Sequence, residues 1–102
     1  FELPEIMKET QLAYFRIFQE GITNVIRHAK ASRVCVKLEM RGDNLVMEII
    51  DDGIGVNAEK IVNMNSLGIL GMKERARMCN GELEIENIPG GGTVLRVSAP
   101  LM

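Results

Sequence analysis

The sequence has no tryptophan and only four aromatic residues, one tyrosine and three phenylalanines. Hydrophobic residues still make up 46% of the chain, so its core must consist mainly of aliphatic side chains and methionine. No apolar run is long enough to span a bilayer, and no N-terminal signal pattern is present. A length of 102 residues predicts a single domain over residues 1–102. We expect this domain to lie in the cytoplasm.

The net charge is small, and cysteine and histidine are rare. The net charge is −2 and the sequence has no basic block, which argues against a nucleic-acid partner. Cys35 and Cys79 do not have a metal-binding spacing, so reduced cysteines are expected, with a single disulfide as the alternative. The chain lacks an initiator methionine and starts inside a pattern. We therefore expect a fragment of a longer protein, and a membrane-anchored parent is compatible with it.

The central pattern is a strand that ends in two acidic residues and two glycines. Residues 45–50 are apolar and β-branched at their end, which predicts a strand, and Asp51, Asp52, Gly53 and Gly55 follow it. Glycine permits positive φ and a close approach of ligand to backbone. An ionised carboxylate only accepts hydrogen bonds. Asp51 is therefore a candidate to receive an exocyclic amine or a metal, with a plain Asp-Gly turn as the alternative.

A helix is predicted over residues 7–29. At 100° per residue its apolar side chains occupy one face, which we expect to be buried: Phe15, Phe18, Ile22, Val25, Ile26 and Ala29. The opposite face carries Glu20, Asn24 and Arg27, with His28 near its edge. This polar stripe is either a solvated face or one wall of a nucleotide pocket. In a pocket, the amide oxygen of Asn24 can complete an Mg²⁺ shell made otherwise of phosphate oxygens and water.

Two hairpins and a glycine-rich turn complete the pattern. Residues 33–40 alternate between two sets of side chains and are predicted to form a hairpin with residues 45–50. Residues 82–87 and 93–98 flank a tight glycine loop. Gly68, Gly71 and Met72 open a second predicted helix over residues 71–79, and such a turn can bind phosphate through its unpaired N–H groups. A flexible loop is the alternative. The basic residues that follow are interpreted as helix surface: Lys73, Arg75 and Arg77.

The motifs Glu-x-x-x-Asn, Asp-x-Gly-x-Gly, Gly-x-x-Gly-Met and Gly-Gly-Thr occur here in the order that resembles the GHKL ATP-binding fold. Residues 14–29 resemble the N box of sensor histidine kinases of the nitrate-sensor and lipid-sensor type nearly residue for residue, and the similarity extends from about residue 3 to residue 101. The resemblance implies an α/β two-layer sandwich. A mixed, mostly antiparallel sheet would carry the helices on one face, with a further strand near the family's start.

The resemblance also implies ATP and Mg²⁺ as cofactors. Asp51 would accept the adenine amino proton, with Thr93 beside it and with Gly53 and Gly55 admitting the base. Asn24 would bind Mg²⁺. The remaining positions would surround the phosphates: Glu20 in the general-base position, Arg27 and His28 near the phosphates, and Gly68, Gly71 and Met72 shaping the phosphate loop. Residues 56–67 would form a short ATP lid without a phenylalanine-containing box.

The function implied is transfer of the ATP γ-phosphate to a histidine. His28, the single histidine, lies in the N box, so the substrate histidine is expected on a dimerisation domain of a homodimeric parent, with a response regulator as the next partner. We expect this chain to bind Mg-ATP without autophosphorylating alone. The alternatives are an anti-sigma-factor-like serine kinase, a non-catalytic nucleotide-sensing module and a stand-alone ATP hydrolase.

Overall fold

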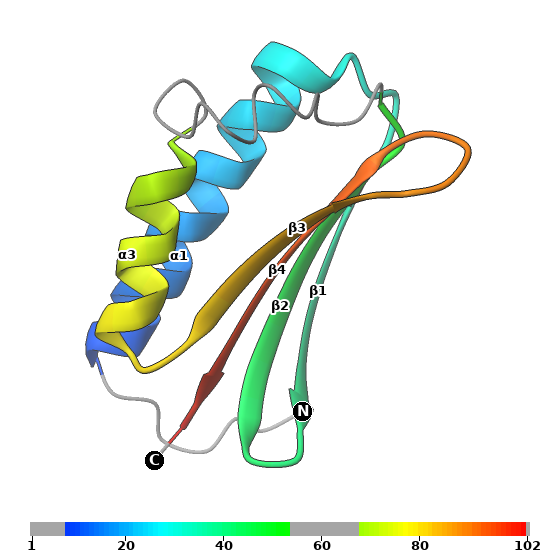
Figure 1. Cartoon of the computed structure of the whole chain (residues 1–102). Helices are drawn as coiled ribbons and strands as arrows, with labels where there is room; N and C mark the ends of the chain where they lie inside the picture. The colour runs from blue at the N-terminus through cyan, green and yellow to red at the C-terminus, as the bar shows by residue number, and fades with distance from the viewer. Residues whose placement is uncertain (1–7, 54–67, 102) are drawn as a thin grey trace.

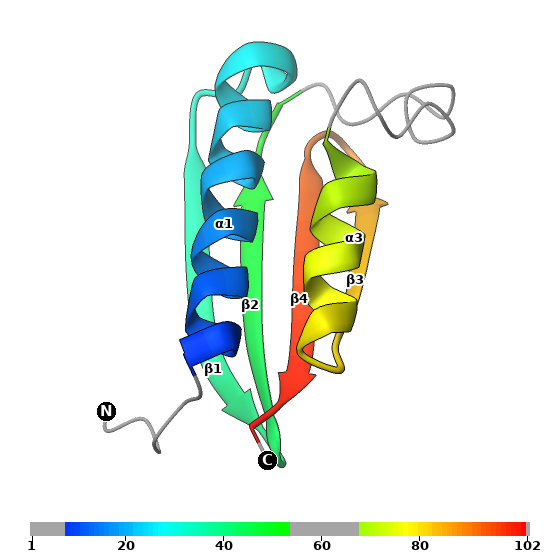
Figure 2. The same ribbon diagram turned by 90° about the vertical axis from the view of Figure 1, so that its left-hand side faces the viewer.

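The computed structural model describes residues 8–53 and 68–101, which form two layers, with both helices on one face of a sheet (Figure 1). In chain order the elements are α1 (Lys8–Asn24), the π-helical segment η1 (Val25–Ala29), β1 (Val34–Arg41), β2 (Asn44–Asp51), α3 (Ile69–Met78), β3 (Glu82–Asn87) and β4 (Thr93–Pro100). In Figure 2, α1 and α3 run side by side across the sheet. This confirms the predicted two-layer α/β sandwich.

The sheet has the strand order β1-β2-β4-β3, and each neighbouring pair is antiparallel. The four strands begin and end within two residues of their predicted bounds. A mixed sheet would also contain a parallel pair, and none occurs among the strands of residues 8–53 and 68–101. No helix in those two segments is long and apolar enough to cross a membrane.

The core lies between the helices and the inner face of the two central strands. Alternate residues of β2 and β4 point toward the helices, and Leu45, Met47 and Ile49 pair in register with Ala99, Val97 and Leu95. The helices contribute mostly aliphatic and methionine side chains to the same cluster: Ala13, Ile17, Ile69, Met72 and Ala76. Among residues 8–53 and 68–101 the one fully buried aromatic residue is Tyr14, whose hydroxyl donates a 2.5 Å hydrogen bond to the Leu45 carbonyl. The core of the described residues is therefore mainly aliphatic, with Met47 and Met72 within it, in line with the prediction.

The buried face predicted for the first helix is wrong at two of its positions. Phe15 and Ile26 are 54% and 78% exposed, while the buried residues of α1 include Ala13, Ile17 and Gly21. Gly21 explains the difference, because a Cβ there would lie 2.7 Å from Cδ1 of Ile49. The helix thus packs against β2 through its small residues, and apolar periodicity alone does not reveal that preference.

The remaining apolar positions of the predicted face are partly buried. Phe18, Ile22 and Val25 pack against the edge of the core, as expected, and the side chain of Ala29 lies outside the described residues. After Asn24 the helix widens into η1, so a rotation of 100° per residue no longer holds. The positions of Ile26 and Arg27 therefore could not be extrapolated from the α-helical part.

The outer face of the sheet carries a row of alternating charges across all four strands. Lys37, Glu48, Arg96 and Glu84 are register partners in succession. Arg96 donates a 2.8 Å hydrogen bond to Glu48, which is 7% exposed and also receives Arg41 at 3.2 Å. Cross-strand pairs of opposite charge stabilise a sheet without a second covering layer. This face therefore suits solvent, and the inner face is the one available to build a site.

The Glu48 carboxylate should make stability depend on pH. Its hydrogen bond with Arg96 lowers the pKa of Glu48, so the stabilisation is present above about pH 4.3, the pKa of an unfolded glutamate, and is lost as the pH falls through the lower native pKa. We expect Glu48→Gln to flatten the loss of unfolding free energy between about pH 5 and pH 3, measured by urea titration. Glu82→Gln, on the same face but outside these ion pairs, is the matched control. An unchanged slope in Glu48→Gln would contradict the assignment.

Candidate functional site

Asp51 and Thr93 lie opposite each other where β2 ends and β4 begins. Both are on the inner face, beneath the helices, and are only 5% and 7% exposed. The Asp51 carboxylate accepts a 2.8 Å hydrogen bond from the Gly53 N–H, which orients it at the strand end. A buried carboxylate is costly unless its oxygens receive donors. This end of the sheet therefore presents a fixed acceptor to any donor group that enters beneath the helices.

Asp52, the second residue of the acidic pair, has a structural role. The exposed Asp52 carboxylate receives the Ser32 hydroxyl at 2.6 Å and the N–H groups of Ser32 and Arg33, each at 2.8 Å. These hydrogen bonds, that of the Ser32 hydroxyl foremost, lower the pKa of Asp52. Asp52 thereby ties the segment before β1 to the end of β2. These contacts of Asp52 were not predicted from the sequence, where the available signal was Ser32 just ahead of a predicted strand.

The glycine loop before β4 packs against the backbone of residues 51–53. Gly92 has φ +107°, and a Cβ built on it would lie 2.1 Å from the Asp51 carbonyl oxygen. A Cβ on Gly91 would lie 3.5 Å from the Gly53 carbonyl oxygen. The predicted tight loop is confirmed, and its glycines allow it to pack directly on the backbone that carries Asp51.

The polar stripe of the first helix is only partly brought to the site. Glu20 and Asn24 are half-buried near the end of α1, whereas Arg27 is exposed in η1. The side chain of His28 and the whole of Gly55 lie outside the described residues. The structure therefore places Glu20 and Asn24 on the helix that covers the sheet and points Arg27 toward solvent.

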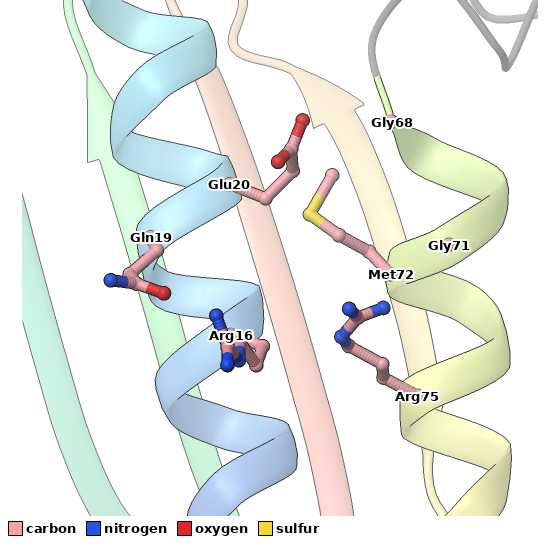
Figure 3. A pocket seen from close by; sticks show the side chains of 7 residues that line it. All are labelled: Arg16, Gln19, Glu20, Gly68, Gly71, Met72 and Arg75. Atoms are coloured by element: carbon pink, nitrogen blue, oxygen red, sulfur yellow. The ribbon is translucent and has the colours of Figure 1, made fainter.

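A pocket of about 250 Å³ lies between α1 and α3 (Figure 3). Its lining includes Glu20 and the three positions predicted for the phosphate loop, Gly68, Gly71 and Met72. Gly68 has φ +67°, and a Cβ on it would lie 2.3 Å from Oε1 of Glu20. The carboxylate thus rests against a backbone position with no side chain, just before α3 begins. The predicted N-box acid and the glycine turn are brought together.

Three further residues line this pocket that the sequence analysis did not select for it: Arg16, Gln19 and Arg75. Arg16 precedes Glu20 by four residues and so shares its helix face, which was a readable signal. Gln19 precedes Glu20 by one residue, about 100° away around the helix, and the sequence carried no such signal for it. Arg75 was interpreted as helix surface. It is exposed but extends along the pocket, so that interpretation was incomplete.

The donor set for a metal is small. Among residues 8–53 and 68–101 no group of three or more His, Cys, Asp or Glu side chains could hold an ion. Magnesium in nucleotide sites often takes one or two protein oxygens and completes its shell with phosphate oxygens and water. The single amide oxygen of Asn24 fits that role. An independent all-protein metal centre would need a cluster that the described residues do not contain.

The packing of Gly92 against Asp51 gives a test with an internal control. Gly92→Ala should destabilise the fold by more than about 2 kcal/mol, because positive φ and a backbone clash act together. Gly42→Ala, at φ +61° with no atom within 4 Å, should cost about 1 kcal/mol. Urea denaturation of both variants measures the difference. Equal losses would show that the close approach at Asp51 does not constrain the fold.

Comparison with known proteins gives consistent matches. A family model described as histidine kinase-, DNA gyrase B-, and HSP90-like ATPase matches residues 9–102. The sensor histidine kinase LiaS of Bacillus subtilis is 38% identical over 96 residues, which is 94% of this chain and 26% of that protein. The histidine-protein kinase/phosphatase DegS of Brevibacillus brevis is 39% identical over 95 residues, 92% of this chain and 24% of that protein.

The fold has close structural counterparts. The blue-light activated histidine kinase of Erythrobacter litoralis superposes with a TM-score of 0.82 at 24% identity, covering 98% of this chain and 33% of that one. The chain therefore spans about a quarter of the two sequence relatives and a third of this structure.

Proposed function

Because the chain belongs to the histidine kinase-, DNA gyrase B-, and HSP90-like ATPase family and is the ATP-binding catalytic domain of a two-component sensor histidine kinase, we propose that it binds ATP together with Mg²⁺ and donates the γ-phosphate to a histidine on a separate dimerisation helix. The observation that carries this proposal is the buried, oriented Asp51 carboxylate beside Thr93.

The base would bind at the end of the sheet. One Asp51 oxygen is held by the Gly53 N–H, and the carboxylate can accept the exocyclic amino group of adenine. The Thr93 hydroxyl, on the neighbouring strand, supplies a second polar contact directly or through water. Gly53 and Gly55 carry no side chain that would obstruct the base. The site would therefore favour adenine. A base with a carbonyl oxygen in place of the amino group would set that oxygen against the Asp51 carboxylate, and two acceptors cannot form a hydrogen bond.

The phosphates would extend toward α1 and the start of α3. Gly68 and Gly71 leave backbone N–H groups near a helix N-terminus that favours anions, and Met72 forms part of the wall there. Mg²⁺, when bound, neutralises phosphate charge, and Asn24 would supply its protein oxygen. Glu20 would orient the attacking group, while Arg27 and His28 lie farther along the same helix. Such a site acts through positioning and charge neutralisation.

The partners follow from the part of the relatives that this chain spans. We propose that residues 1–102 are the catalytic domain of a longer homodimeric kinase that faces the cytoplasm, with the parent protein either soluble or membrane-anchored. The substrate histidine would come from its dimerisation domain and the phosphoryl group would pass to a response regulator. The relatives are named a sensor histidine kinase and a signal transduction histidine-protein kinase/phosphatase, and these names support a kinase parent.

Nucleotide titration tests the assignment of Asp51. Calorimetry with a non-hydrolysable ATP analogue should show binding that Mg²⁺ strengthens, and Asp51→Asn should weaken it at least about 30-fold by replacing an acceptor with a donor. Asp52→Asn, the neighbouring acid that braces Ser32 and Arg33, should change affinity less than about two-fold. Equal affinity in the wild type and Asp51→Asn would place the base elsewhere.

The absence of a substrate histidine can be tested directly. Incubation of the chain with radiolabelled Mg-ATP should give no acid-labile phosphohistidine, because His28 belongs to the N-box segment of the ATP site. A separately expressed dimerisation domain from a related kinase serves as the positive acceptor. Phosphohistidine on the isolated chain would contradict the expectation that the substrate histidine lies on a separate dimerisation domain.

A further inference from the structure

Two arginines from different helices share the pocket between α1 and α3. Arg16 lies one turn before Glu20 on α1, and Arg75 lies one turn after Gly71 on α3 (Figure 3). The guanidinium of Arg75 extends back along its helix toward Gly71. A Cβ built on Gly71 would lie 3.8 Å from Nη1 of Arg75. The positive charge therefore lies beside the glycine turn rather than away from it.

Both arginines are exposed and form no ion pair with the described residues. Within the described segments neither guanidinium lies within 4 Å of a carboxylate, although Glu20 lines the same pocket. On the outer face of the sheet, by contrast, Arg41 and Arg96 are both paired with glutamates. Two cations in one pocket repel each other, and an anion bound between them removes that cost. The pocket carries two positive charges against the single negative charge of Glu20.

Guanidinium groups bind phosphate oxygens through paired hydrogen bonds, and two of them can grip a doubly charged phosphate from both sides. The opposite end of the pocket is formed by Gly68 and Glu20, where the proposed function places the nucleotide phosphates. A chain of phosphates that passes Gly68 and Glu20 would therefore lead toward the two arginines (Figure 3).

We propose that Arg16 and Arg75 form a clamp for the terminal phosphate of ATP and give the site its preference for a triphosphate over a diphosphate. This inference rests on the proposed function. The two arginines act on binding and orientation of the γ-phosphate. They lie outside the contacts that hold the base.

Paired titrations with a non-hydrolysable ATP analogue and with ADP test the clamp. Arg16→Gln and Arg75→Gln should each weaken the ATP analogue about ten-fold, the effect of one lost charge-assisted hydrogen bond, and change ADP affinity less than about two-fold. Arg77→Gln, an exposed residue of the same helix outside the pocket, is the matched control and should change neither. Arg16→Lys should fall between wild type and Arg16→Gln because it keeps the charge but not the planar fork.

The outcomes separate this inference from the function on which it rests. Equal weakening of ADP and the ATP analogue, or no weakening of either, would overturn the clamp while the wild type still binds nucleotide through Asp51. Failure of the wild type to bind either nucleotide would overturn the proposed function and the clamp with it. Thermal unfolding of each variant shows whether a loss of affinity comes from a loss of fold.

Discussion

The close approach of α1 to β2 at Gly21 is the contact on which the rest of the structure depends. No side chain separates the helix from Ile49 there, and Tyr14 anchors the preceding turns to the Leu45 carbonyl. Together these contacts set the rotation of α1 about its axis. Glu20 consequently faces α3 and the glycine turn at Gly68, while Phe15 faces solvent. A helix rotated to bury Phe15 would carry Glu20 away from the pocket.

At the end of the sheet the two neighbouring acids have different roles. One faces the candidate site and the other holds the backbone in place. Asp51 and Asp52 are adjacent, so a strand sends them to opposite sides. Asp51 turns inward under the helices and is supported by the glycine loop at Gly92, whereas Asp52 turns outward and braces Ser32. The brace keeps the start of β1 in register with that position.

The two faces of the molecule differ in how their charges are balanced. On the outer face, glutamates and arginines of neighbouring strands form ion pairs with one another. In the pocket between the helices, Arg16 and Arg75 outnumber Glu20 and lack carboxylate partners in the described segments. Charge on a protein surface steers an anionic ligand toward the region where it is uncompensated. The inner side of the molecule is therefore the side that would attract a nucleotide.

The sequence by itself determined the strands, the glycine turns and the acidic strand end, because alternation, turn residues and motif order are local properties. Through resemblance it predicted Thr93 beside Asp51, and Glu20 and Gly68 around the phosphates. Only the tertiary structure decided the rotation of α1, the widening after Asn24 and the presence of Arg16 and Arg75 in one pocket. These depend on a small residue meeting a distant strand and on two helices lying side by side, and such long-range packing leaves no periodic signal along the chain.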